Sequence, residues 1–550
     1  MQDSTQIPNN LPESYIPPKL GIFTKILLAT FPKYGMERLK AKAQVNWLTA
    51  NGYITPDSNK RSMRDWYARG RSADVDTLPA LKSSRAGSRD LYMNTPIATA
   101  ALRRKVTNVV GSGLNLQSRI NREFLGLTPE QAEAWERKTE QEFKLWANSK
   151  NCDATRSQTF NELQQMVFLN KMLSGDVFVL LPFRRLKNFP YSLTLQVLEG
   201  DQCETPDDIS TSMDFISDRT RAGIEIDSFG APVKYWFRTK HPGDVTSLER
   251  KWVSIKAFGP RSGRRQVLHL FNKERPGQRR GMPELAPVME KLKMISRLDE
   301  SELMAAVISS YFTVFIKKTT GITQPFAPSF TAENSVKNPS DPQDDFNQEM
   351  APGAMITLAD DESIDIADPK RPNGAYEPFF QTIVKEIGAA LEVPFELLML
   401  MFNSSYSASR AAILEGWKTF RKERVNFVSD FNQPVYEEWL AEGVLRGRIS
   451  APGFFADPLI RQAWSGAFWG GPGMGQIDPK KETEAALLRV NGNLSNYETE
   501  SQDINGGDWD GAMDRRSREE TKLEELGLNQ PSPVMEDSED SDNSDEDENE

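Results

Sequence analysis

Cysteine and histidine are nearly missing from this 550-residue sequence, which contains two of each. Cys152 and Cys203 are too few for a disulfide framework and fit a reducing compartment. Neither CxxC nor HExxH occurs, so the common zinc sites are excluded. His269 lies in the apolar run QVLHLF, where a packing role is expected. We therefore expect no metal site among these residue types.

Signatures of nucleotide and acyl-transfer chemistry are missing as well. Neither GxxxxGK[ST], the loop that cradles nucleotide phosphates, nor GxSxG, the turn that presents a nucleophilic serine, occurs. The glycine-rich run 466–475 matches no nucleotide-binding spacing, and a rigid aromatic turn is the better interpretation. We expect no cofactor and no catalytic activity.

Long apolar runs are also lacking. The longest, 22–30 and 391–402, are interrupted by charged residues and fall short of the ~20 residues that span a bilayer. Polar residues open the chain in place of the basic region of a secretory signal. The expectation is a soluble protein, made inside the cell, with no membrane partner.

Negative charge is concentrated at the C-terminal end. The formal net charge is −11, but residues 536–550 alone hold ten acids, no base and no apolar residue. This segment is expected to stay disordered because it has nothing to bury, and the rest of the chain is close to neutral. A sequence-reading DNA-binding protein usually carries a basic surface. None is evident, so any contact with nucleic acid is expected to be loose.

Two acidic segments are candidate metal sites. Residues 360–362 with Asp365 and Asp368 offer the paired carboxylates that two-metal phosphodiester chemistry needs, although a solvated turn is the simpler interpretation. Residues 503–511 resemble a calcium loop but lack the ligands at its fifth and twelfth positions. A glycine-rich linker between helices is favoured there.

Local patterns predict an α+β chain of two to four domains. Helices are expected over 95–110, over 128–149, which opens with the capping-box sequence Thr-Pro-Glu-Gln, and over 160–173. A buried strand follows from 177 to 182. Residues 192–271 then read as short strands, namely SLTLQVLE, GIEID, VKYWFRT, KWVSI and QVLHLF, with Gly230 at a hairpin tip.

The second half is predicted to be mainly helical. Long helices are expected over 283–308, 376–392 and 411–440, and shorter ones over 480–490 and 515–526. A polar insert at about 319–349 separates the first two. The third should kink at Pro434, and its expected buried side carries Trp417, Phe420, Phe427, Phe431, Val435 and Trp439.

These motifs follow one another as in a known family. The segment 271–306 resembles the lambda family of phage portal proteins, which carry Pro-Gly-Gln-x-Arg-Gly-x-Pro just before a long helix. The resemblance covers roughly residues 85–527, and residues 1–20 and the acidic end have no obvious counterpart. Other matching segments are RDLYMNTPIATAALRRKVTNVVGSGLNLQ, LNKMLSGDVFVLL, GIEIDSFGAPVKYWF, EIGAALEVPFELLM, NSSYSASRAAILEGWKTF and WGGPGMGQIDPKKETEAALLRVNGNLS.

The resemblance implies a portal subunit with no catalysis of its own. Its expected partners are further copies of the chain in a ring, usually a dodecamer, together with double-stranded DNA, terminase, the major capsid protein and head-completion or neck proteins. Its expected place is the capsid portal vertex of the virion, after assembly in the host cytoplasm. The ring would be the channel for DNA packaging and ejection.

The resemblance also implies a division of the chain. The expected parts are an N-terminal arm and wing extension (1–84), an α+β wing (85–282), a first stem helix (283–315), a clip (316–352), a return strand with the second stem helix (353–396), a tunnel loop (397–410), a long wing helix with an aromatic turn (411–479), a helical crown (480–527) and a disordered acidic tail (528–550).

Five uncharged residues are candidates for the channel wall: Asn403, Ser404, Ser405, Tyr406 and Ser407. Because these side chains carry no full charge, they can contact duplex DNA and do not bind its phosphates as strongly as Lys and Arg would. The plain alternative is a surface loop in which Ser407 or Ser409 caps the following helix.

Two functions from other classes compete with the portal. One is another structural head protein, such as a neck adaptor or scaffold. The other is a metal-dependent nuclease or terminase-like enzyme that uses the acids near Asp360–Asp368.

Overall fold

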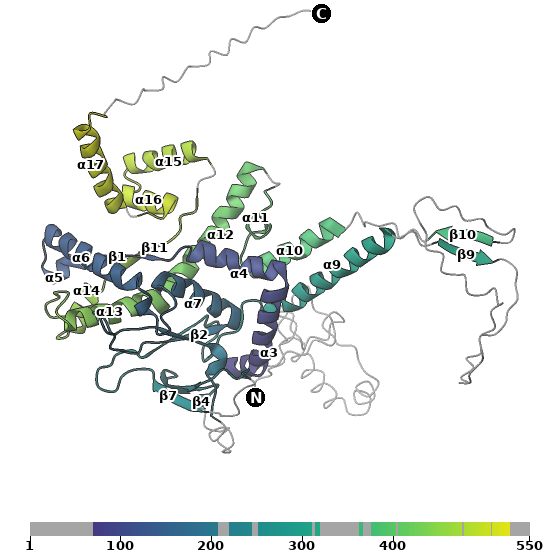
Figure 1. The fold of residues 1–550 in the computed structure, drawn as a ribbon, viewed down its shortest axis with the longest axis horizontal. Helices are drawn as coiled ribbons and strands as arrows, with labels where there is room; N and C mark the ends of the chain where they lie inside the picture. Colours follow the sequence, from purple (N-terminus) through teal and green to yellow (C-terminus); the bar gives the residue numbers. More distant parts are fainter. Residues whose placement is uncertain are drawn as a thin grey trace, which may run out of the picture. The chain divides into compact units, whose positions relative to one another are not determined.

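The chain forms two units, Met1–Ser72 and Ala73–Glu550, and the helices and strands of Figure 1 belong to the second. The computed structural model describes residues 70–206, 219–244, 251–310, 314–318, 362–366, 376–402, 405–475, 478–507 and 509–528. Residues 1–69 of the expected N-terminal arm, the polar insert at 319–349 and the acidic segment 536–550 therefore lie outside the described residues.

Capping sequences fix the first helices where the sequence predicts them. Helix α4 spans Pro96–Val109 and α6 spans Pro129–Ala147, where Thr128 and Gln131 form the expected capping box. Helix α7 (Phe160–Ser174) has a second capping box and ends at Gly175, whose φ of +83° suits glycine. A short α5 (Arg122–Leu125) lies between α4 and α6.

Helix α3 (Ala73–Asn94) is not among the helices that the sequence predicted. Its buried positions include Asp74, Arg85 and Ser88 beside Leu81 and Leu91. Polar residues thus interrupt the apolar stripe that reveals an amphipathic helix, and Pro79 lies inside it. The sequence pattern therefore did not reveal this helix.

Strand β2 (Asp176–Leu180) lies at the centre of the fold, between β3 (Gln196–Glu199) and β8 (Val267–Phe271) in an antiparallel sheet. All five β2 residues are buried because both faces of the strand are covered. Val177 and Val179 belong to the large helical core, whereas Phe178 and Leu180 pack with the second sheet.

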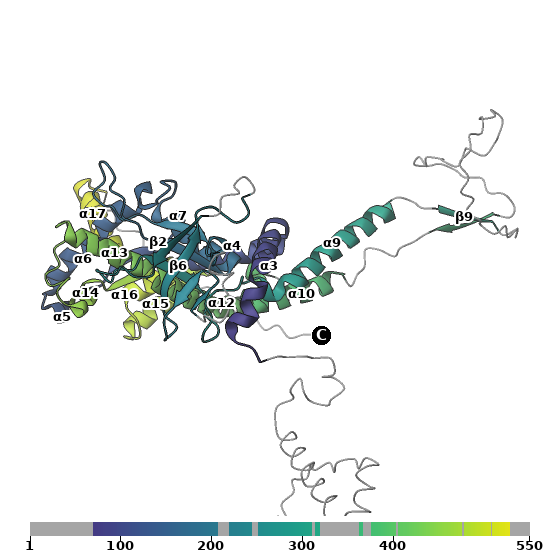
Figure 2. The same ribbon diagram turned by 90° about the horizontal axis from the view of Figure 1, so that it is seen from below.

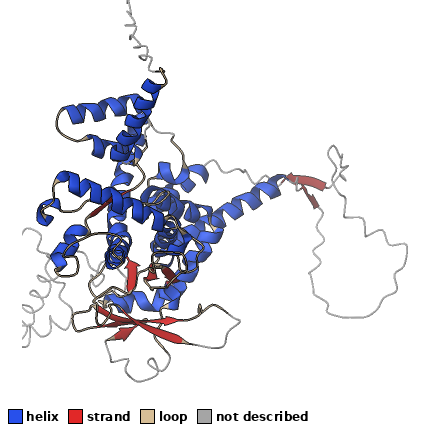
Figure 3. Ribbon diagram, turned by 60° about the vertical axis from the view of Figure 1, so that its left-hand side comes forward, coloured by secondary structure: helices blue, strands red, loops and turns tan. Residues whose placement is uncertain are grey.

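The second sheet is a meander of β4 (Thr220–Arg221), β5 (Ile224–Ile226), β6 (Pro232–Arg238) and β7 (Trp252–Lys256), drawn red in Figure 3. The predicted hairpin between β5 and β6 is confirmed. Asp227 closes its turn, because its Oδ1 accepts from the backbone N–H of Phe229 and of Ala231, each at 2.8 Å.

Helix α9 (Met289–Ser310) begins later than residue 283, because a 3₁₀ turn, Ala286–Val288, precedes it. Pro287 has no N–H to donate to the carbonyl of Pro283, so an α-helical turn cannot form there. Helix α10 (Tyr376–Ala390) runs beside α9 in Figures 1 and 2. The strands β9 (Val314–Lys318) and β10 (Glu362–Ile366) pair antiparallel.

The third long helix is interrupted as expected near Pro434. It consists of α12 (Tyr406–Phe427), a π-helical turn (Val428–Asn432) and α13 (Gln433–Leu445), after a short α11 (Phe395–Met399). A proline cannot donate to the carbonyl four residues earlier, and the wider π turn accommodates that missing bond. All six aromatic and aliphatic residues predicted for its buried side are buried.

The C-terminal part differs in one respect from the prediction. Residues 467–470, expected in an aromatic turn, form β11 (Ala467–Gly470) after α14 (Pro458–Trp464), and β11 pairs with β1 (Asn115–Ser118). The remaining helices are α15 (Pro479–Asn491), α16 (Tyr497–Asn505) and α17 (Trp509–Glu525). Gly506, with φ +65°, ends α16, so residues 503–511 do contain the expected linker.

One buried carboxylate ties these elements together. Asp176, at the start of β2, is fully buried and accepts from Arg280 Nε and Arg85 Nη2, each at 2.5 Å. Burial alone would raise the pKa of Asp176, but the two arginines outweigh it and hold that pKa far below its usual range. The carboxylate is therefore ionised at any physiological pH.

The arginines also satisfy backbone carbonyls around the carboxylate. Arg280 donates to the carbonyls of Gly200, Cys203 and Ala222 at 2.5, 2.8 and 2.7 Å, and Arg85 donates to that of Ser174 at 2.8 Å. A Cβ at Gly281 would lie 1.9 Å from the carbonyl oxygen of Gly175, so only glycine fits there. The chain just before α9 is thereby fixed to β2.

Replacing Asp176 by asparagine should lower the free energy of unfolding by about 3–5 kcal/mol, because it removes the carboxylate that two buried arginines share. Urea denaturation measures this loss. Asp90→Asn is the control, since Asp90 is half exposed and pairs with Lys293 only at 3.5 Å. Equal stability of the two variants would contradict a central role for Asp176.

Candidate functional site

Helices α9 and α10 form an antiparallel pair (Figures 1 and 2), with apolar side chains between the helices and polar contacts at the edge of the pair. Leu292 and Ile295 of α9 are buried in the same core cluster as Val384 and Ile387 of α10. Lys291 forms an ion pair with Glu386, and the Tyr376 hydroxyl donates to Asp299. Burial, and then this hydrogen bond, raises the pKa of Tyr376 to about 12. The contacts hold α10 along α9.

The C-terminal half of α9 exposes apolar side chains. Leu303 is 68% exposed and Met304 is 60% exposed, and Met294, nearer the start of the helix, is 59% exposed. A helix that is apolar on its solvent side is typical of a surface that another molecule covers.

The five candidate channel residues lie between α11 and the first turn of α12. Asn403 and Ser404 are outside the described residues. Ser405 is the N-cap of α12, since its Oγ accepts from the N–H of Ala408 at 3.4 Å, so the cap is neither Ser407 nor Ser409. Tyr406 and Ser407 belong to the helix, which begins five residues before the predicted start.

The candidate acidic sites do not gather into a described metal site. Asp360, Asp361 and Asp368 lie outside the described residues, and Glu362 and Asp365 lie on β10. Asp503, in the calcium-loop-like segment, accepts from Arg421 Nη2 at 2.7 Å, so its carboxylate already has a cationic partner.

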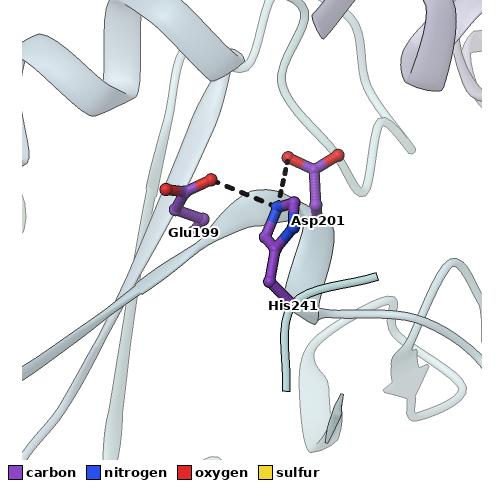
Figure 4. A group of neighbouring side chains, drawn as sticks. All are labelled: Glu199, Asp201 and His241. Atoms are coloured by element: carbon purple, nitrogen blue, oxygen red, sulfur yellow. Dashed lines mark ion pairs between the residues drawn. The ribbon is translucent and has the colours of Figure 1, made fainter. Parts of the chain in front are cut away.

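One group that the sequence did not reveal brings metal-ligand types together: Glu199, Asp201 and His241 (Figure 4). The His241 Nε2 atom lies 3.4 Å from Glu199 and 3.9 Å from Asp201. Arg89 contacts both carboxylates, at 3.0 Å to Glu199 and closer to Asp201. Because β4, β5 and β6 separate His241 from the acids in the sequence, local spacing did not reveal the group.

The tautomer of His241 argues against a metal role for this group. Its Nδ1 accepts from the backbone N–H of Gly243 at 3.0 Å, so the proton of the neutral ring is on Nε2. A metal-ligating histidine instead donates its second ring N–H and keeps the ligating nitrogen free. The group is therefore an ionic contact, in which Arg89 and the Nε2–H face two carboxylates.

The remaining histidine and both cysteines are packed in the interior. His269 stacks between Phe178 and Phe271, and burial lowers its pKa, so the ring is neutral. Its predicted packing role is confirmed. Burial raises the pKa of Cys152 and of Cys203 to about 12, and both thiols point to backbone carbonyls. Such thiols are poor nucleophiles.

Within the described part of the chain, no helix is both long and apolar enough to cross a membrane.

The buried Arg85–Asp176–Arg280 network was missed at the sequence level. Both Gly175-Asp176 and the Pro-Gly-Gln-x-Arg-Gly-x-Pro turn stood out as motifs, but spacing cannot show that the aspartate and the arginine meet. A sequence signal for this network was the apolar run that contains Asp176, because a charge within a buried strand such as β2 needs a partner.

Comparison with known proteins places these features in a family. Residues 59–424 match the family model of the phage portal proteins of the lambda family. Portal protein B of Escherichia phage lambda is 26% identical over 485 residues, covering 85% of this chain and 89% of that protein. The portal protein of Escherichia phage N15 is likewise 26% identical, with the same coverage.

Among solved structures, a chain from the neck of a native gene transfer agent particle, determined with C12 symmetry, is similar with a TM-score of 0.40. It is 12% identical, and the match covers 80% of this chain and 96% of that one. Portal proteins are structural components and not enzymes, which agrees with the expected lack of catalysis. Because the family model spans more than half of the sequence, the chain belongs to the lambda family of phage portal proteins.

Proposed function

We propose that the chain assembles into a closed ring at one capsid vertex and that double-stranded DNA passes through the ring. Family membership supports the proposal, and so does the exposed apolar surface of α9. A ring forms when one face of each subunit binds a different face of the next and the rotation closes. Such contacts need apolar residues that a single subunit leaves exposed, and Leu303 and Met304 are of this kind.

The parts of the proposed ring follow the fold. Helices α9 and α10 are the stem, β9 leads into the clip (316–352), which would dock terminase and later the head-completion proteins, and β10 is the return strand. The sheets around β2 and the helices α3–α7 and α12–α14 are the wing, which would face the major capsid protein. Helices α15–α17 are the crown. The ring is proposed to be a dodecamer in the virion, assembled in the host cytoplasm.

The segment that joins α11 to α12 is proposed to line the channel. Asn403, Ser404 and Ser405, with Tyr406 and Ser407 of the first helical turn, carry no charge. A moving duplex must be guided but must slide, and lysine or arginine would hold it through counterion release. The proposed lining therefore contacts DNA without a strong grip.

A neck adaptor or scaffold remains the second candidate, because such proteins also assemble through exposed apolar surfaces. Particle stoichiometry tests the portal against a many-copy head protein: one ring of this chain per particle supports the portal, and many copies spread over the shell contradict it.

Electron microscopy of the purified protein should show rings, and Leu303→Asp should abolish them, because a carboxylate would be buried against the neighbouring subunit. The matched control is Leu145→Asp on α6, since Leu145 is 72% exposed and Leu303 is 68% exposed. The control should still form rings. A wild-type protein that stays monomeric at high concentration would contradict the ring.

Ser404→Arg should reduce DNA packaging while rings still assemble, because each subunit would add one phosphate contact to the channel. Packaged DNA per particle, measured by nuclease protection, should fall at least severalfold at low salt and recover partly at higher salt. Ser404→Gln is the uncharged control. Equal packaging by both variants would argue against a position in the channel.

Deletion of residues 536–550 should leave ring assembly unchanged, because a segment of ten acids with no apolar residue cannot join a core. Sedimentation velocity of the truncated and full-length proteins compares their ring fractions. Loss of rings on truncation would give the tail an unexpected role in assembly.

A further inference from the structure

Two loops at one end of the β2–β8 pair form a basic surface. The strands are antiparallel, so the chain leaves β2 close to where it enters β8, beyond the pair Leu180 and Val267. The two loops are residues 183–188 and 258–265, here called the basic loops. They contain no acid and six cations, namely Arg184, Arg185, Lys187, Arg261, Arg264 and Arg265.

Direct contacts hold the basic loops side by side. Arg264 Nη2 donates to the carbonyl of Leu181 at 2.6 Å, and the Arg264 guanidinium lies 3.8 Å from the centre of the Phe183 ring. The guanidinium of Arg265 lies 5.5 Å from the ring centre of Phe258. Cation–π contacts of this kind attract and orient a guanidinium group. The fold thus assembles a basic surface that the sequence did not make evident, from two segments far apart in the chain.

The acids of the described chain neutralise only part of this surface. Arg264 pairs with Glu438 at 2.5 Å, and Arg265 interacts electrostatically with Asp430. Three exposed cations form no ion pair with any residue that the structure describes: Arg185, Lys187 and Arg261. A surface with one sign of charge attracts a partner with the opposite sign. Because the three cations are spread over two loops, a partner with several negative charges fits better than a single small anion.

The chain itself contains such a partner. Residues 536–550 hold ten acids, no base and no apolar residue. A segment of this composition has no apolar surface to bury, so ion pairs are the main contacts that it can make with a folded surface. Its charge is therefore complementary to that of the basic loops.

The acidic segment is long enough to reach the basic loops of its own subunit. Residues 529–550 follow the last described residue, Leu528, and can span up to ~70 Å when fully extended. A compact folded unit of about 480 residues is roughly 60 Å across. A tethered segment also has a high effective concentration, so that several ion pairs, each weak at a surface, are sufficient for binding.

We propose that residues 536–550 dock on the basic loops of their own subunit and shield these loops from duplex DNA. Carboxylates of the segment pair with Arg185, Lys187 and Arg261. The docking does not depend on the proposed ring, because every residue in it belongs to one subunit. It is also compatible with ring assembly by a protein that lacks the segment.

Carbodiimide cross-linking of the full-length protein tests the contact, because this reagent joins a lysine to a carboxylate that touches it. Lys187 is the only lysine of the basic loops. Mass spectrometry should find cross-links between Lys187 and residues 536–550 at low salt. Their yield should fall at least threefold in the double variant Arg185→Gln/Arg261→Gln, and also in about 0.5 M salt, which screens exposed charges.

Lys138 on α6 is the matched control lysine. It is exposed, and its neighbour Arg137 pairs with Asp514 of α17 at 3.3 Å, so it lies close to the helix that precedes the acidic segment. It should give at least threefold fewer cross-links to the segment than Lys187. Equal yields at the two lysines, or cross-links of Lys187 that persist in the double variant, would overturn the docking.

Duplex binding tests the shielding. Deletion of residues 536–550 should raise the affinity for a short labelled duplex at least threefold, measured by fluorescence anisotropy at low salt. Arg185→Gln/Arg261→Gln in the truncated protein should abolish that gain, because the duplex would bind where the segment was. Duplex binding that needs both arginines but is unchanged by the deletion would assign the basic loops to DNA and overturn the inference. A gain that survives the double substitution would contradict it as well.

Discussion

The Asp176 carboxylate is the constraint on which the fold depends. It begins the central strand of one sheet, is fully buried and forms ion pairs with Arg85 of α3 and with Arg280 of the turn that leads to α9. A carboxylate with two arginines leaves one positive charge, and backbone carbonyls around it accept the remaining guanidinium N–H groups. Three segments far apart in sequence are therefore held at one point, and α9 starts from a fixed place.

The contacts around Asp176 also explain the Pro-Gly-Gln-x-Arg-Gly-x-Pro motif of the family in physical terms. Gln278 folds the turn, since its side chain accepts from the N–H groups of Glu274 and Arg275 and donates to the carbonyl of Arg280. Arg280 supplies the buried charge, and Gly281 allows backbone contact with Gly175. The motif is thus a device for anchoring a long helix to a sheet.

Sequence reasoning succeeded where the signal was local. The capping box at Thr128, the hairpin at Gly230 and the buried side of α12 and α13 depend on residues close in the chain, and all are confirmed. Sequence reasoning failed where a structural element depends on contacts between residues far apart in the chain. Residues 467–470 form strand β11 because they pair with β1. Helix α3 was not predicted because its polar residue Arg85 is buried, where it forms an ion pair with Asp176. The channel segment stayed a prediction, since its role depends on neighbours that a single chain does not contain.

One feature of the subunit is unfavourable in isolation, and it concerns the proposed stem. Leu303 and Met304 of α9 expose apolar surface to water. The Asp176 network shows that the subunit satisfies a fully buried charge by itself, whereas these two apolar side chains stay 68% and 60% exposed. Exposed apolar surface on the proposed stem is consistent with a subunit whose contacts are completed by another copy, because burial of that surface would give the interface its affinity.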